Sequence, residues 1–165
     1  MLDIGCGLGG VDIMLARGHG CRIIALDIEP QLIDRTRANA EEAGVAEFID
    51  FRLVVSGPLG HADGSVDVVF GKDAWVQIAD KRALFGEVFW VLKLGGRLLA
   101  GDWCRIEQTY SALMERFFEL EGLTYNMEFH DTYRALLGGL GFVDIELTDI
   151  TAPRPMTSMT TSRAR

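Results

Sequence analysis

Short apolar runs alternate along the chain with longer segments in which apolar residues recur every three or four positions. The apolar runs predict buried strands, at residues 22–26, 49–55, 66–70 and 97–101. Helices are predicted between and after them, at residues 30–44, 81–93, 110–122 and 131–140. One more strand is expected near residues 143–148.

Turn and capping residues bound these elements. Pro30 suits the first position of a helix, and Gly44 supplies the stop of the same helix. Asp80 is expected to cap the next helix, and the Gly95-Gly96 pair to end it before the following strand. The elements therefore have start and stop signals as well as the right periodicity.

Alternating strands and helices predict an α/β fold: a Rossmann-like, doubly wound and mostly parallel sheet with helices on both faces. A length of 165 residues with 48% apolar residues suits one domain with a proper core, which we assign to residues 1–151. Residues 152–165 contain no acid, no aromatic residue and two prolines. We expect them to form a loose tail.

Charge and cysteine content narrow the class of protein. A formal net charge of −8 argues against nucleic acid or an anionic membrane surface as a partner. The three cysteines are far apart in the sequence and form no C-x-x-C pair, so they suggest neither a disulfide framework nor a zinc site. The sequence has no apolar segment as long as a membrane span and no secretory leader pattern. We expect a cytoplasmic protein and assign no metal ligands.

The opening stretch "MLDIGCGLGG" predicts a strand that turns tightly into a helix. Its glycines fit two ligands equally well, a dinucleotide or S-adenosylmethionine. Asp27, at the end of the second strand, would accept hydrogen bonds from ribose hydroxyls in either case. These residues alone leave the choice between the two cofactors open.

A later stretch favours one of the two cofactors. "DGSVDVVFGKDAWVQIADKRALFGEVFWVLKLGGRLLAGDW" resembles the middle of class I S-adenosylmethionine-dependent methyltransferases, where the fourth strand, a substrate-facing loop, a helix and the fifth strand follow in that order. Together with "LDIGCGLGG" and "ALDIEP", the resemblance covers about residues 1–150. Within that class, "GKDAWVQIADKRALF" and "LLAGDWC" are similar to stretches of phosphoethanolamine N-methyltransferases and related small-molecule methyltransferases.

The resemblance implies an enzyme that transfers a methyl group from S-adenosylmethionine to a small-molecule acceptor, most simply an amine. Asp3 would reach the amino group of the cofactor, and Asp27 would hold its ribose. The residues expected around the rest of the cofactor are Gly5, Cys6, Gly7, Gly9, Ile28, Ser56, Gly57 and Lys72. Asp73 and Gln77 would be the catalytic residues, the first holding the amine and the second orienting a ligand.

The sequence also departs from the family pattern. Gln77 stands where these enzymes have a histidine, Trp103 where they have a tyrosine, and Leu94 where they have a proline. Only Met1 and Leu2 precede Asp3, so we expect the lid helices of the family to be missing and turnover to be slow. In this family an antiparallel strand follows the sixth strand along the chain and lies between the fifth and sixth. Since the tail does not resemble that strand, residues 143–148 are expected to pair poorly, or directly with residues 97–101.

Simpler interpretations compete with these roles. Asp3 could stabilise a turn, Asp27 and Asp73 could cap the helices that follow them, and Gln77 could be a polar helix residue. Two other functions also stay open: a shortened methyltransferase-like domain that binds cofactor with little turnover, and a nicotinamide-dependent oxidoreductase. The oxidoreductase hypothesis leaves "VLKLGG" unexplained.

Overall fold

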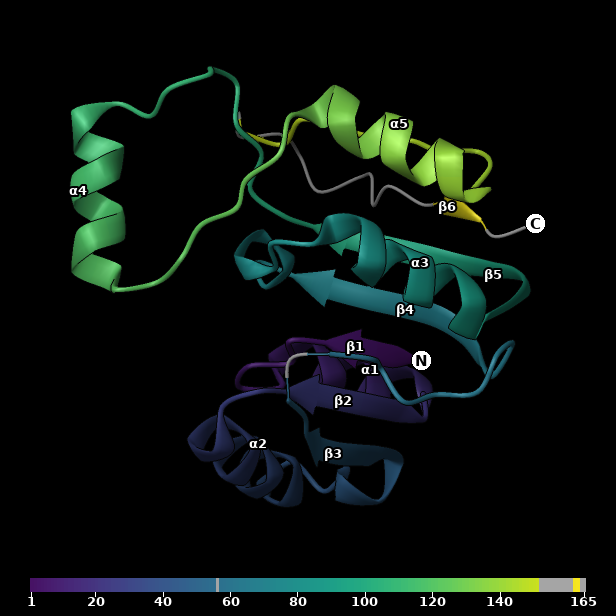
Figure 1. Ribbon diagram of the computed structural model, residues 1–165. Coiled ribbons are helices and arrows are strands. Elements are labelled where there is room, and N and C mark those ends of the chain that lie inside the picture. Colours follow the sequence, from purple (N-terminus) through teal and green to yellow (C-terminus); the bar gives the residue numbers. More distant parts are fainter. Residues whose placement is uncertain (56, 152–161, 164–165) are drawn as a thin grey trace.

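The computed structural model describes residues 1–55, 57–151 and 162–163. Its strands form one six-stranded sheet in the order β3-β2-β1-β4-β5-β6 (Figure 1). The strands are β1 (Leu2–Ile4), β2 (Ile23–Asp27), β3 (Ile49–Leu53), β4 (Val66–Lys72), β5 (Leu92–Gly101) and β6 (Ser162–Arg163). β1 to β5 are parallel, and β6 runs antiparallel to β5. The strand order therefore reverses between β1 and β4.

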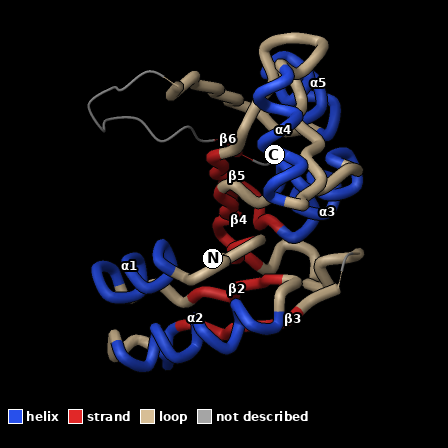
Figure 2. The backbone as a smooth tube through the Cα atoms, turned by 90° about the vertical axis from the view of Figure 1, so that its left-hand side faces the viewer, coloured by secondary structure: helices blue, strands red, loops and turns tan. Residues whose placement is uncertain are grey.

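Helices cover both faces of this sheet, as the alternation of elements predicts. They are α1 (Gly10–His19), α2 (Pro30–Glu42), α3 (Lys81–Val91), α4 (Ala112–Glu121) and α5 (His130–Leu140), with short 3₁₀ helices η1 (Ala46–Phe48) and η2 (Trp75–Gln77). Figure 2 shows α1 on the opposite side of the sheet from α3 and α5. The predicted doubly wound fold is confirmed.

Each face of the sheet has its own apolar core. One core includes Ile23, Ile33 and Phe51, and the other includes Val69, Phe85 and Leu137. The strand side chains alternate between the two cores, because successive residues of a strand point to opposite faces. This explains why the central strands are almost wholly apolar.

The Gly95-Gly96 pair does not end the preceding helix, and this prediction is wrong. α3 ends at Val91, and β5 begins at once with Leu92. The pairing of β4 with β5 shifts register between Val66 and Val68, opposite the segment that contains the two glycines. Gly95 has a φ of +75° there, so the glycines allow an irregularity within the strand rather than a helix stop.

The expected strand near residues 143–148 is also absent from the part of the chain that the structure describes. Asp144 has a φ of +52°, which interrupts an extended backbone, and the carbonyl of Ile145 accepts a hydrogen bond from Arg134 Nη1 at 2.8 Å. Instead Ser162 and Arg163 pair with β5. The prediction that the tail supplies no antiparallel strand is therefore wrong, whereas residues 143–148 pair poorly, as predicted. The rest of the predicted loose tail lies outside the described residues.

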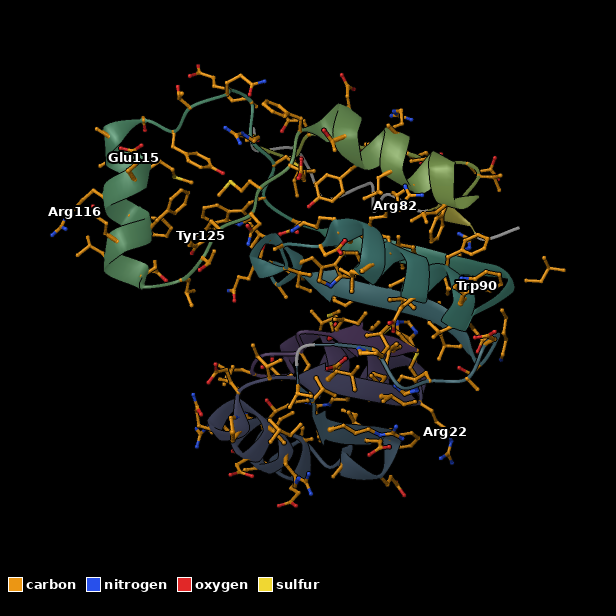
Figure 3. The ribbon with its side chains drawn as sticks, viewed as in Figure 1. Arg22, Arg82, Trp90, Glu115, Arg116 and Tyr125 are labelled. Carbon is orange, nitrogen blue, oxygen red and sulfur yellow. The ribbon has the colours of Figure 1, made fainter. Side chains whose placement is uncertain are left out.

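α4 projects beyond the edge of the sheet to which the arrowheads of β2 and β4 point (Figure 1). Ser111 caps it, since its side chain accepts a hydrogen bond from the N–H of Met114 at 3.2 Å. None of its residues is buried. Tyr125, in the segment that returns from α4, lies between that helix and the sheet (Figure 3). None of the described helices is long and apolar enough to span a membrane.

Candidate active site

The predicted site residues gather at one edge of the sheet. Most of them follow the carboxyl ends of β1, β2 and β4, which are neighbours in the sheet. In open α/β sheets, ligands bind at this edge where the strand order reverses. Of the remaining predicted residues, Gly57 is exposed beyond β3, and Ser56 lies outside the described residues.

The loop after β1 turns through three glycines in the left-handed region. Gly5, Gly7 and Gly9 have φ values of +86°, +54° and +70°. The N–H groups of Gly5 and Cys6 donate hydrogen bonds to the carbonyl of Leu26, at 2.8 and 2.9 Å. These bonds fix the start of the loop to β2.

The surroundings of the three glycines differ. A Cβ added to Gly5 would lie 2.3 Å from the Cβ of Ala74, and one added to Gly9 would lie 2.3 Å from Cγ2 of Thr36. A Cβ added to Gly7 would meet no described atom within 4 Å. Gly5 and Gly9 therefore serve close packing inside the chain, whereas Gly7 lies on the open side of the loop, where a ligand can approach the backbone.

Asp27 links the glycine loop to the start of α2. Its Oδ2 accepts a hydrogen bond from the N–H of Gly7 at 2.8 Å, and its Oδ1 accepts one from Glu29 at 3.0 Å. Each carboxylate oxygen can accept a second bond, so the side chain can hold the loop and still bind a hydroxyl. Its neighbour Ile28 is 56% exposed and can lie against a ligand.

Asp3 in β1 and Asp12 in α1 form a buried pair of acids next to the glycine loop. They are 3% and 0% exposed. Burial, followed by the charge of Asp12, raises the pKa of Asp3 to about 8, and burial raises the pKa of Asp12 to about 6. Asp12 is not among the residues predicted from the sequence, although an acid on the buried face of the helix after a glycine loop is an unusual pattern that could have revealed it.

Cys6 does not have the environment of a reactive thiol. Its side chain is buried, and burial together with the charges of Asp27, Asp12 and Asp3 raises the pKa of the thiol. A thiol of this kind stays protonated at neutral pH and is a poor nucleophile. Cys6 can therefore pack in the loop and donate its backbone N–H, but its thiol does not act as a covalent nucleophile.

Lys72 and Asp73 stand at the end of β4 and form an exposed ion pair. Asp73 has a φ of +54°, and its N–H donates to the carbonyl of Gly101 at 2.8 Å. Asp73 does not cap η2, because that helix begins at Trp75 with Ala74 as its N-cap. The simple capping interpretation of Asp73 is therefore wrong.

Asp102 lies directly after β5, beside Asp73, and is not among the residues predicted from the sequence. Its Oδ1 accepts a hydrogen bond from the N–H of Trp103 at 2.9 Å, and its Oδ2 lies 3.5 Å from the hydroxyl of Tyr133. Its pKa is raised to about 6, mainly by burial; the N–H of Trp103 and the charge of Lys81 oppose the rise, and the charge of Asp73 adds to it. An acid directly after a predicted central strand was the available signal.

Lys81 is an unusual cation because it is 4% exposed. Its Nζ donates hydrogen bonds to the carbonyls of Trp75, at 2.6 Å, and Ile78. Burial lowers the pKa of this ammonium group, while Asp102 and Glu128 favour its charged form. Lys81 thus fixes the η2 segment and places a positive charge behind Asp102.

Gln77 closes η2 with an exposed side chain. Its carbonyl accepts a hydrogen bond from Asn126 Nδ2 at 3.0 Å, and the N–H of Asn126 donates to the carbonyl of Val76 at 2.7 Å. The segment that returns from α4 is therefore tied to η2. The role of Gln77 in orienting a ligand stays a prediction.

Aromatic residues of α4 and of the segments before and after it pack against one another. Trp103 stacks on Phe117 with ring centroids 6.1 Å apart, and Tyr125 stacks on Phe118 at 4.4 Å. Trp103 is 43% exposed, so it can contact a ligand. Trp75 cannot, because it is 1% exposed and its Nε1 donates to the carbonyl of Ile4 at 3.1 Å.

Hollows in the surface do not by themselves mark this site. One hollow of about 510 Å³ opens at the opposite edge of the sheet, beside Met1, Arg22 and Ser65. The acidic side chains and the glycine loop lie at the edge formed by the carboxyl ends of the strands, which is also where ligands bind in open α/β sheets. We therefore locate the site by its side chains and backbone geometry. No group of three or more His, Cys, Asp or Glu residues in the described ranges could hold a metal ion.

Comparison with known proteins agrees with this geometry. The methyltransferase domain family matches residues 2–100. Phosphoethanolamine N-methyltransferase 1 of Arabidopsis thaliana is 30% identical over 151 residues, which are 92% of this chain and 30% of that protein. The chain therefore spans less than a third of the length of this relative.

Two solved structures share the fold. A putative sarcosine dimethylglycine methyltransferase from Galdieria sulphuraria is 27% identical, with a TM-score of 0.76 over 86% of this chain and 53% of that one. A phosphoethanolamine N-methyltransferase 2 from Haemonchus contortus, in complex with phosphomonomethylethanolamine and S-adenosylhomocysteine, is 23% identical, with a TM-score of 0.83 over 92% of this chain and 35% of that one.

The fold, the glycine loop and the acid after β2 define a class I methyltransferase domain. The chain belongs to the methyltransferase domain family, whose cofactor is S-adenosylmethionine. The cofactor expected from the sequence is thus confirmed, and the nicotinamide hypothesis loses its support. The open side of Gly7, the exposed Ile28 and the Asp27 carboxylate fit such a cofactor at the carboxyl edge.

Proposed function

We propose that the chain transfers the methyl group of S-adenosylmethionine to the nitrogen of a small amine similar to phosphoethanolamine. The observation that carries this proposal is a pair of acids at the ends of adjacent strands, Asp73 after β4 and Asp102 after β5. The bond from the N–H of Asp73 to Gly101 keeps the two residues side by side. The names of the Arabidopsis and Galdieria relatives support an amine nitrogen as the acceptor.

The two acids suit the two requirements of N-methylation. An ammonium group has no lone pair, so one group must hold the cation and another must take its proton. Asp73 is exposed and can attract the ammonium group. Asp102, with a pKa of about 6, is ionised at neutral pH but is a stronger base than an ordinary carboxylate. The proton passes from nitrogen to a carboxylate oxygen of Asp102, which leaves the lone pair on nitrogen.

The cofactor supplies a methyl group on a positively charged sulfur, which the nitrogen lone pair displaces in line. The residues of the chain position the amine for this displacement. Trp103 and Tyr125, whose ring centroids are 6.3 Å apart, offer aromatic surface to a cationic amine near Asp73. Gln77, the other predicted catalytic residue, has an amide without useful basicity, so we assign it to orientation and assign the proton to Asp102.

The test is release of S-adenosylhomocysteine from a panel of small amines that includes ethanolamine, phosphoethanolamine, glycine and sarcosine. We expect Asp73→Asn and Asp102→Asn each to lower the rate by about 10²-fold or more, the usual loss when a positioned acid or base is removed. Binding of S-adenosylhomocysteine should persist in both variants. Asp34→Asn, a change of the same kind on the exposed face of α2, is the control.

The pH profile gives an independent test. The rate should rise as pH increases through about 6, because Asp102 must be ionised to accept the proton. Cofactor binding without methylation of any amine would contradict the proposal. That result would favour a domain that binds cofactor with little turnover.

A further inference from the structure

The buried acids Asp3 and Asp12 have no role in the chemistry proposed above. Neither Asp3 Oδ1 nor either carboxylate oxygen of Asp12 has a hydrogen-bond partner in the described ranges, although both residues are more than nine-tenths buried. Buried polar atoms without partners are rare, because each forfeits its hydrogen bonds to water. Such a cluster therefore requires a physical explanation.

The two buried carboxyl groups act on each other. Besides burial, the charge of Asp12 raises the pKa of Asp3, and the Asp3 side chain in turn affects the pKa of Asp12. Two carboxylates can share a hydrogen bond only when one of them carries a proton, since an ionised carboxylate has no donor. Two buried carboxyl groups that interact in this way cannot easily both be ionised. A single shared proton would therefore satisfy the pair.

The charged groups around the pair make it a site for a cation. Asp27 at the end of β2 adds a negative charge that raises the pKa of Asp3. The charges of all three acids also raise the pKa of the Cys6 thiol in the loop. In the described part of the chain, no lysine or arginine side chain is paired with Asp3 or Asp12.

We propose that Asp3 and Asp12 hold one proton between them in the cofactor-free protein and release it when the ammonium group of the cofactor's amino-acid end arrives. This rests on cofactor binding at the glycine loop and not on the identity of the methyl acceptor. One carboxyl O–H bond breaks, the proton passes to solvent, and the cation of the cofactor replaces it. Asp12 is thus a positioning residue that acts through Asp3.

Proton release has a predictable direction. A cation beside the pair lowers its affinity for a proton, so the cofactor binds more tightly as pH rises towards the pKa of the free pair. Between about pH 5.5 and pH 7.5, where the α-amino group of the cofactor stays mostly charged, we expect S-adenosylhomocysteine to bind about tenfold more tightly. Asp12→Asn removes the shared proton and should flatten this dependence.

Calorimetry of S-adenosylhomocysteine binding near pH 7, in phosphate and in Tris, counts the protons released. We expect release from the wild-type protein and almost none from Asp12→Asn. Asp102→Asn is the matched control, because Asp102 also has a pKa of about 6, at the same edge of the sheet. This control should release as many protons as the wild type.

A second measurement does not depend on a folded variant. The infrared band of a protonated carboxyl group should be present in the free wild-type protein at about pH 7 and should vanish when S-adenosylhomocysteine binds. Binding without proton release, or equal release from Asp12→Asn, would overturn the proposal. Failure to bind at any pH would overturn it together with the cofactor assignment, whereas binding without amine methylation would overturn only the proposed acceptor.

Discussion

The backbone N–H of Gly7 donates a hydrogen bond to the Asp27 carboxylate at 2.8 Å, while the Thr36 hydroxyl donates to the carbonyl of Gly7 at 2.5 Å. The open glycine of the loop is therefore held from β2 on one side and from α2 on the other. A loop fixed in this way needs little rearrangement when a ligand binds, which lowers the entropic cost of binding.

Replacement of Asp27 by alanine should weaken binding of S-adenosylhomocysteine by about 1.5–3 kcal/mol, the range for hydrogen bonds to a charged group. The thermal midpoint should fall as well, because the N–H groups of Gly7 and Glu29 lose their acceptor. Calorimetric titration and a melting curve measure the two effects. Asp50→Ala removes an exposed acid from β3 and should leave the affinity unchanged. Unchanged affinity in Asp27→Ala would show that this side chain does not hold the cofactor.

Alanine at Gly7 and alanine at Gly5 should have different consequences. At Gly7 the new methyl group enters open space, so we expect a stability loss of about 1 kcal/mol from the left-handed backbone and a larger loss of cofactor affinity. At Gly5 the methyl group collides with Ala74, so the thermal midpoint should fall much further. Gly10→Ala, at the start of α1 with open space around it, is the control. Equal stability losses at Gly5 and Gly7 would contradict this assignment.

Gly71 and Trp75 should be strongly coupled. A Cβ on Gly71 would lie 1.9 Å from Nε1 of Trp75, the atom that donates to Ile4. We expect Gly71→Ala to lower the unfolding free energy by about 1–3 kcal/mol, the usual effect of overpacking. Trp75→Ala removes the colliding ring atoms, so the double variant should lose less than the sum of the two single losses. Urea unfolding of the four proteins measures the coupling, and strict additivity would show that the two residues do not meet.

Local periodicity was enough to predict the central strands and the helices. The apolar run that contains Val69 and the spacing of Phe85 and Val88 in α3 can each be read within a few neighbouring residues. The Gly95-Gly96 irregularity and the absence of a strand at residues 143–148 depend instead on pairing with distant segments. No local pattern encodes that pairing.

The residues of the candidate site also fall into two groups: those in local motifs, and those that only the fold brings into the site. Asp3, Asp27 and the glycines stand in recognisable motifs, so the sequence alone was enough to propose them as site residues. Asp12 and Asp102 are ordinary acids in the sequence, and only the fold gives them unusual environments. For Asp102, burial raises the pKa, while Lys81 on α3 and Tyr133 on α5 oppose the rise. Neither the burial nor these two neighbours can be seen before the helices are placed.

The buried pair of acids should also make the stability of the free protein depend on pH. Asp3 and Asp12 have pKa values of about 8 and about 6 in the folded chain, against 3.8 for an ordinary aspartate. A group whose pKa is raised by folding binds protons more tightly in the folded state, so its contribution to stability is present at low pH. That contribution falls as pH rises from about 4 to about 8.

Asp12→Asn removes one of the two charges that must be buried at high pH. We expect this variant to be more stable than the wild type by about 1–3 kcal/mol near pH 8, with the difference shrinking towards pH 5. Urea unfolding of the cofactor-free proteins across that range measures the effect, and Asp34→Asn on the surface of α2 should track the wild type. A variant less stable than the wild type near pH 8 would mean that the protein stabilises the Asp12 carboxylate in its ionised form. The two acids would then not share a proton.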